Sequence, residues 1–145
     1  MSLHNSSRGS GLGDEFTDGL DQAPSAARVV SADLELAMLT IDRVSAGDEF
    51  LVRELLTRFF RSVEQDLVLL DAVGLWSESS CTHLHRIAGA LLGLGATRIG
   101  AQCRELSEAL TRPPTDDTRI AADDVQALVR QFLCRLVSAN QHRCP

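Results

Sequence analysis

Apolar residues recur every three or four positions through most of this chain, and this spacing restricts the polypeptide to helices. The longest example runs from about Asp48 to Val73, where apolar positions fall on one helical face and Arg and Glu residues occupy the other. No segment alternates apolar and polar residues for long enough to form a strand. The pattern therefore predicts an all-α protein.

Five helical segments are expected between the glycine, proline and serine residues that interrupt the pattern. The first is short, begins at Ser31 or Asp33 and ends at Gly47. The others are expected at about 48–73, from 79 or 80 to 93–95, from 97 to the prolines at 113 and 114, and from 117 or 123 to 139. Short connections between long helices favour antiparallel neighbours. We therefore expect an antiparallel up-and-down four-helix bundle with an additional short N-terminal helix.

The chain length of 145 residues allows one domain and a tail. Residues 1–29 are rich in Gly, Ser and Asp without any period, which is typical of a flexible tail or linker. The bundle is expected over residues 30–140, followed by a frayed C-terminus at 141–145. A single closed bundle predicts a monomer.

Charge and hydropathy argue against several classes of partner. The net charge of −6 argues against nucleic acid, because phosphate binding needs a basic face. The longest apolar run, Ile87–Ala96, is shorter than the ~20 residues that span a bilayer. The N-terminus has no apolar segment typical of a signal peptide. We therefore expect a cytoplasmic protein with no membrane contact by this domain.

The chain has 4 cysteines and no CxxC pair, so neither a zinc ribbon nor a thioredoxin-type site is predicted. Cys103 and Cys134 fall on apolar stripes and are expected as small buried residues. Free thiols in a core fit a reducing compartment.

His85 and Gly89 lie one turn apart on the same face of the third predicted helix. Glycine within a helix costs about 1 kcal/mol relative to alanine, so its presence needs a reason. The missing side chain would let a bulky group approach the imidazole. Ala88 is also small, so the ring is expected to be exposed and reachable. A neutral imidazole, whose pKa is ordinarily about 6.5, has a nucleophilic nitrogen that can accept a phosphoryl group.

Two other interpretations of this segment compete with phosphoryl transfer. A single histidine on a helix surface is ordinarily a solvated residue without chemistry. Cys81, His83 and His85 resemble a metal-ligand cluster, but only Cys81 and His85 share a face, and no nearby carboxylate completes a site. His83 is expected to be solvated, and no metal is expected.

The residues around His85 form a longer pattern that spans two predicted helices. The positions are His85, Gly89, Ala90, Gly95, Ile99 and Cys103. This string resembles the signature of histidine-containing phosphotransfer (HPt) domains, most closely those at the C-terminal ends of hybrid sensor histidine kinases. The resemblance covers about residues 34–137, with the motif in residues 84–106.

The resemblance implies a phosphoryl carrier rather than an autonomous enzyme. His85 would accept a phosphoryl group from the Asp of a response-regulator receiver domain and pass it to another receiver Asp. Gly89 would give steric access, and Ala88, Ala90 and Leu92, with exposed parts of the second helix, would form the docking patch. No cofactor of its own is implied, since Mg²⁺ is expected on the receiver. The chain would be free-standing or part of a hybrid histidine kinase.

One position departs from the family pattern, which commonly has Lys where this chain has Ala88. Arg86 is a candidate for supporting the phosphate instead, although it lies about 100° around the helix from its neighbour His85. Arg86 as an ordinary solvated charge is the competing interpretation. The departure also motivates an alternative function, in which the bundle docks a receiver or kinase domain and regulates it without carrying phosphate.

Overall fold

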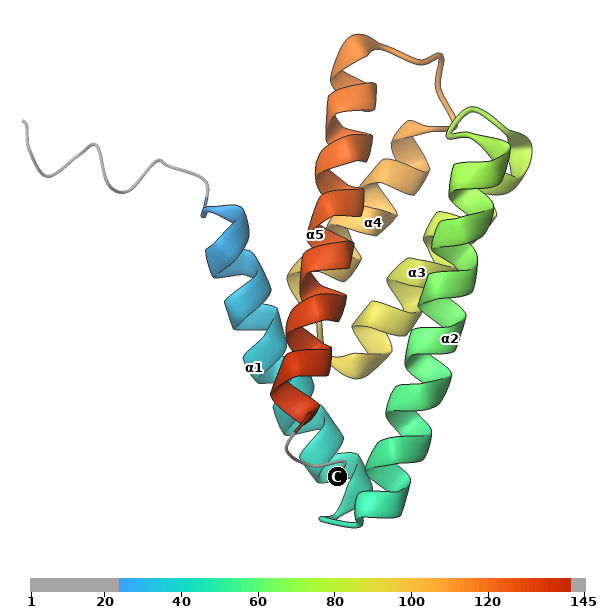
Figure 1. Cartoon of the computed structure of the whole chain (residues 1–145). Coiled ribbons are helices and arrows are strands. Elements are labelled where there is room, and N and C mark those ends of the chain that lie inside the picture. The colour runs from blue at the N-terminus through green and yellow to red at the C-terminus, as the bar shows by residue number, and fades with distance from the viewer. Residues whose placement is uncertain (1–23, 142–145) are drawn as a thin grey trace, which may run out of the picture.

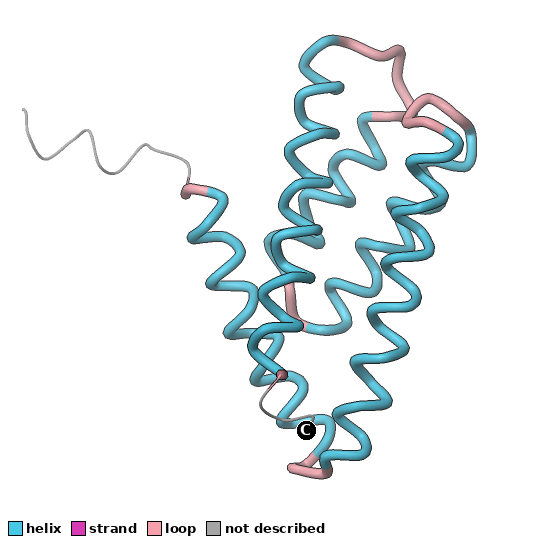
Figure 2. The backbone as a smooth tube through the Cα atoms, in the orientation of Figure 1, coloured by secondary structure: helices cyan, strands magenta, loops and turns pink. Residues whose placement is uncertain are grey.

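The computed structural model describes residues 24–141 (Figure 1). This part of the chain contains helices and no strand (Figure 2). The helices are α1 (Ala26–Ser45), α2 (Glu49–Val73), α3 (Glu78–Leu94), α4 (Thr97–Ala109) and α5 (Asp116–Asn140). The predicted all-α class is confirmed. Of the tail expected at 1–29 and the frayed end expected at 141–145, residues 1–23 and 142–145 lie outside the described residues.

The ends of α2 and α3 follow from local chemistry that the sequence displays. The Asp48 carboxylate accepts hydrogen bonds from the backbone N–H groups of Phe50 and Leu51, which have no partner inside the helix. Gly95 ends α3 in the left-handed region at φ +99°. A Cβ at Gly95 would lie 2.5 Å from the Thr40 hydroxyl oxygen, so the turn between α3 and α4 packs closely against α1.

The first helix is longer than predicted. Helix α1 has 20 residues and begins after Ser25, whose hydroxyl accepts the N–H of Arg28. The prediction of a short helix capped by Ser31 or Asp33 is wrong, and residues 26–29 belong to the domain rather than to a tail. The reason is that Val29 and Val30 are buried and extend the apolar stripe by a turn.

Asp33 serves a different helix from the one predicted. Its carboxylate is completely buried and accepts the backbone N–H groups of Arg98 at 3.2 Å and Ile99 at 2.7 Å. The residue that precedes α4, Ala96, has no side chain able to cap it. Helix α1 therefore supplies the N-terminal cap of α4 from 65 residues away.

The helices share one apolar core. The rings of Phe59 on α2 and Phe132 on α5 meet edge to face with centroids 6.5 Å apart. Helix α3 packs against both α2 and α4, and α1 contacts each of the other helices. None of the described helices is apolar over a stretch long enough to cross a bilayer.

The two cysteines expected in the core have different environments. Cys103 is fully buried on α4, and burial raises the pKa of its thiol to about 12. Cys134 is exposed on α5, so its prediction as a buried residue is wrong. Phe132, Leu133 and Leu136 form the buried stripe, and Cys134 lies two residues, or about 200°, beyond Phe132 around the helix.

Candidate functional site

His85 lies on the solvent-exposed side of α3, one turn before Gly89. Gly89 is also exposed, and a Cβ added there would meet no atom within 4 Å outside the local backbone. Open space therefore lies beside the imidazole on the side of the following turn. A group carried by another molecule can therefore approach the ring across Gly89.

The three residues expected to form the docking patch do not share one environment. Ala88 is only 1% exposed, so the expectation that it contacts a partner is wrong. It lies seven residues after Cys81 and four before Leu92, on the face of α3 that meets α4. Leu92 is half-buried and faces Gly100 on α4, while Ala90 is half-buried. Only the exposed parts of Ala90 and Leu92 are available to a partner.

A buried acidic residue on α2 interacts with two side chains on the face of α3 that is turned toward α2. Asp66 is 1% exposed, and its Oδ1 lies 2.9 Å from Nδ1 of His83. Its Oδ2 lies 3.6 Å from Nε of Arg86. The His83 side chain is only 12% exposed, so the expectation that His83 is solvated is wrong. Sequence reasoning missed this cluster of Asp66, His83 and Arg86.

The sequence did contain a signal for this cluster. Asp66 lies between Val63 and Leu70 at helical spacing, so it interrupts the apolar stripe of α2. A carboxylate in such a position must find a partner, because an unpaired buried charge is very costly. The pattern indicates that a partner exists, but it does not identify His83 and Arg86.

Arg86 is consequently drawn toward α2. Its side chain is 57% exposed, and its guanidinium lies next to the buried Asp66 carboxylate. No hydrogen bond reaches Oδ2 of Asp66, so the interaction with Arg86 is a longer ion pair. The sequence offered two interpretations of Arg86, phosphate support or an ordinary solvated charge. The structure adds a third, because Arg86 forms an ion pair with Asp66.

Comparisons of the chain with protein-family models, with curated proteins and with solved structures found no match.

The side of α3 that faces α4 contacts that helix both before and after His85 in the chain. The Ser107 hydroxyl donates to the Cys81 carbonyl at 3.2 Å, and the Cys81 thiol donates to the Ser107 carbonyl at 3.5 Å. At the other end, a Cβ at Gly100 would lie 2.8 Å from Cγ of Leu92, so the helices approach closely there. The segment of α3 that carries His85 is therefore held against α4 at both of its ends.

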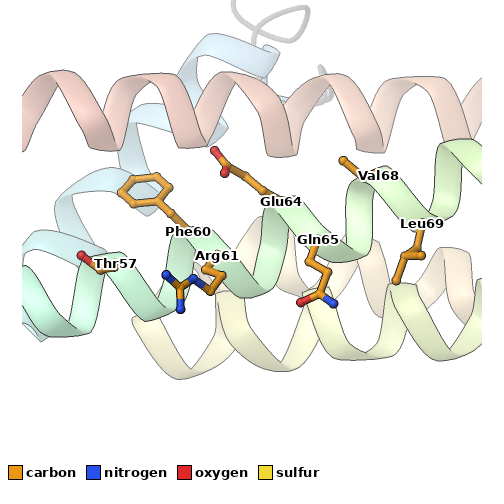
Figure 3. Close-up of a pocket in the computed structure, with 7 residues that line it drawn as sticks. All are labelled: Thr57, Phe60, Arg61, Glu64, Gln65, Val68 and Leu69. Carbon is orange, nitrogen blue, oxygen red and sulfur yellow. The ribbon is translucent and has the colours of Figure 1, made fainter.

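An open hollow of about 600 Å³ runs along the outer face of α2 (Figure 3). Arg61 and Gln65 lie on the side of α2 toward α3, and Phe60 and Glu64 lie on the side toward α5. Within residues 24–141, no group of three or more His, Cys, Asp or Glu side chains is placed to hold a metal ion. The lining of the hollow combines apolar side chains such as Phe60 and Val68 with the polar side chains of Arg61, Glu64 and Gln65.

Proposed function

We propose that this chain is a phosphotransfer module of a multistep two-component phosphorelay. In this proposal His85 accepts a phosphoryl group from the Asp of a response-regulator receiver domain and passes it to the Asp of another. The single observation that carries the proposal is an exposed imidazole with open space over the following turn at Gly89. The resemblance of residues 84–106 to the HPt signature supports the same function.

The proposed reaction needs only a nucleophile from this chain. A ring nitrogen of neutral His85 attacks the phosphorus of the receiver's aspartyl phosphate, forming an N–P bond. The P–O bond breaks, and its electron pair returns to the Asp carboxylate. Attack by a second receiver's carboxylate reverses these steps and restores the imidazole. Mg²⁺ is proposed to be held by the receiver.

We infer that α2, α3, α4 and α5 form an antiparallel up-and-down bundle, with α1 as an additional helix. The Phe59–Phe132 contact and a 2.9 Å ion pair between Asp71 and Arg130 support closure of the bundle between α2 and α5. Such a bundle would present His85 on a rigid surface and would act as a monomer.

The proposed docking surface is centred on His85 and Gly89. It includes the exposed parts of Ala90 and Leu92 and continues toward Arg61 and Gln65 on α2. A relay component must release its partner, so we expect a transient interface of less than about 1,200 Å². The partners are receiver domains, including one within a hybrid histidine kinase. A cytoplasmic location is part of the proposal, and the free thiols of Cys81 and Cys103 suit a reducing compartment.

The competing function is a docking module that regulates a receiver or kinase domain without carrying phosphate. The observation in its favour is Ala88, which supplies no cation beside His85 and is buried. Binding of receiver domains without phosphoryl transfer from any of them would favour this function.

The test is phosphoryl transfer from a panel of receiver domains labelled with acetyl phosphate. We expect acid-labile, alkali-stable label on the wild-type chain and none on His85→Gln. His83→Asn is the matched control, because an asparagine amide can still donate to Asp66 while removing the second imidazole. Label that persists on His85→Gln would refute the role of His85, and absence of transfer from every receiver would refute the relay function.

A further inference from the structure

Two helical faces meet next to His85. Cys81, His85, Ala88 and Leu92 follow one another at steps of three or four residues and therefore share one side of α3. Gly100, Arg104 and Ser107 share one side of α4 in the same way. Contacts join the two ends of these faces, with Leu92 against Gly100 and Cys81 against Ser107.

These two contacts determine which turn of α3 lies opposite Arg104 on α4. The chain runs from Cys81 to Leu92 along α3 and returns from Gly100 to Ser107 along α4, so the two helices run in opposite directions at this contact. Arg104 lies between Gly100 and Ser107, about 6 Å along α4 from Gly100. Interpolation between the two contacts places Arg104 level with the turn of α3 that carries His85. Arg104 is exposed, whereas its neighbour Cys103 is fully buried. The Arg104 side chain therefore extends from the rim of the α3–α4 contact rather than into the core.

The charge of Arg104 is available, unlike that of Arg86. Within residues 24–141, no carboxylate oxygen lies within 4.0 Å of the Arg104 guanidinium. Arg86, the other cation near His85, lies 3.6 Å from the buried Asp66 carboxylate. Moving Arg86 toward His85 would leave that carboxylate with less compensation, which is costly in the interior. An anion that binds at His85 would therefore pair with Arg104 at a lower free-energy cost than with Arg86.

We propose that Arg104 binds the phosphoryl group on His85 and stabilises the phosphohistidine. This inference rests on the proposed function and assigns the phosphate-binding cation of that site to α4. The planar guanidinium presents two N–H donors to two phosphoryl oxygens, which suits a tetrahedral dianion beside the ring. The small buried Ala88 contributes by letting α4 approach His85 closely.

The experiment uses phosphoramidate as the donor, so that no receiver is needed. Its phosphoryl group moves to an imidazole nitrogen, with an N–P bond formed to His85 and the original N–P bond broken as ammonia leaves. The full chain is phosphorylated, the donor is removed, and loss of the phosphohistidine signal is followed by ³¹P NMR. Peptide mapping assigns the signal to His85. Arg104→Gln is compared with Arg104→Lys, Arg86→Gln and Arg98→Gln, the last being an exposed charge on another side of α4.

We expect Arg104→Gln to shorten the phosphohistidine lifetime about tenfold, since one or two charge-assisted hydrogen bonds are lost. Arg104→Lys should recover part of the lifetime, and Arg86→Gln and Arg98→Gln should change it less than twofold. An unchanged lifetime in Arg104→Gln, or a shortening confined to Arg86→Gln, would overturn the assignment. If the wild type is phosphorylated by phosphoramidate but by no receiver, the relay function fails while this comparison still decides the role of Arg104.

Discussion

Replacing Asp33 with alanine should destabilise the whole domain, although Asp33 lies more than 60 residues from the helix that it caps. Its two carboxylate oxygens accept the first free N–H groups of α4 from Arg98 and Ile99, at 3.2 and 2.7 Å. No side chain at the start of α4 can replace them, because the preceding residue is Ala96. Water has little access, since Asp33 is completely buried.

The size of the effect follows from the groups left unpaired. The Ile99 N–H is buried, and losing its acceptor costs about 2 kcal/mol. The Arg98 N–H is only partly buried, so its loss costs about 1 kcal/mol, similar to a typical N-cap. Asp33→Ala should therefore lower the free energy of unfolding by about 3 kcal/mol. Asp33→Asn keeps one acceptor oxygen and should lower the free energy of unfolding by about half as much.

Urea denaturation followed by helical circular dichroism measures this effect directly. Glu35→Ala is the matched control, because Glu35 is an exposed carboxylate on the same helix and should change stability by less than about 0.5 kcal/mol. The dependence of unfolding free energy on urea should stay unchanged in all variants. An Asp33→Ala protein as stable as the Glu35→Ala protein would refute the capping role.

Two further predictions concern Gly89 and Cys103. Gly89→Ala should raise the free energy of unfolding by up to about 1 kcal/mol, because the added Cβ meets open space, while Gly89→Leu should slow phosphoryl uptake from a receiver but not from phosphoramidate. Rates of ³²P uptake and urea titrations check both, and equal slowing with both donors would contradict steric control. Burial raises the pKa of Cys103 from 9.0 to about 12, so its stabilising contribution is complete below pH 9 and is lost as the pH rises toward 12. Wild-type stability relative to Cys103→Ala should fall by about 1.4 kcal/mol per pH unit in that window, and a pH-independent difference between their urea midpoints would contradict the prediction.

Periodicity and capping residues in the sequence predicted most helix ends. Asp48, Gly74 and Gly95 mark their boundaries by local chemistry, which needs no knowledge of the rest of the molecule. Helix α1 was predicted too short because its first buried residues, Val29 and Val30, follow a segment without apolar period. Burial against distant helices decided that boundary.

The candidate site was predicted only in part, for the same reason. The spacing of His85 and Gly89 placed both on one helical face, which depends only on the local helix, whereas the open space at Gly89 depends on how the other helices pack. Ala88 was misplaced because a small residue fits equally well on a surface or in a contact between helices. Asp66 and His83 are 17 residues apart, so their pairing required the packing of α2 against α3. Sequence patterns indicate which polar residues need partners, whereas the fold determines which partners they find.

The long-range cap also limits how this domain can be shortened. A chain trimmed to α2 through α5 would retain the histidine and the neighbouring helices, yet it would lack the carboxylate that completes the start of α4. In a deletion experiment, damage to α4 would therefore be mistaken for a direct requirement for α1 in the proposed phosphoryl transfer. Transplanting the histidine-bearing helix pair into another protein likewise requires α1, or a substitute acceptor placed ahead of Thr97.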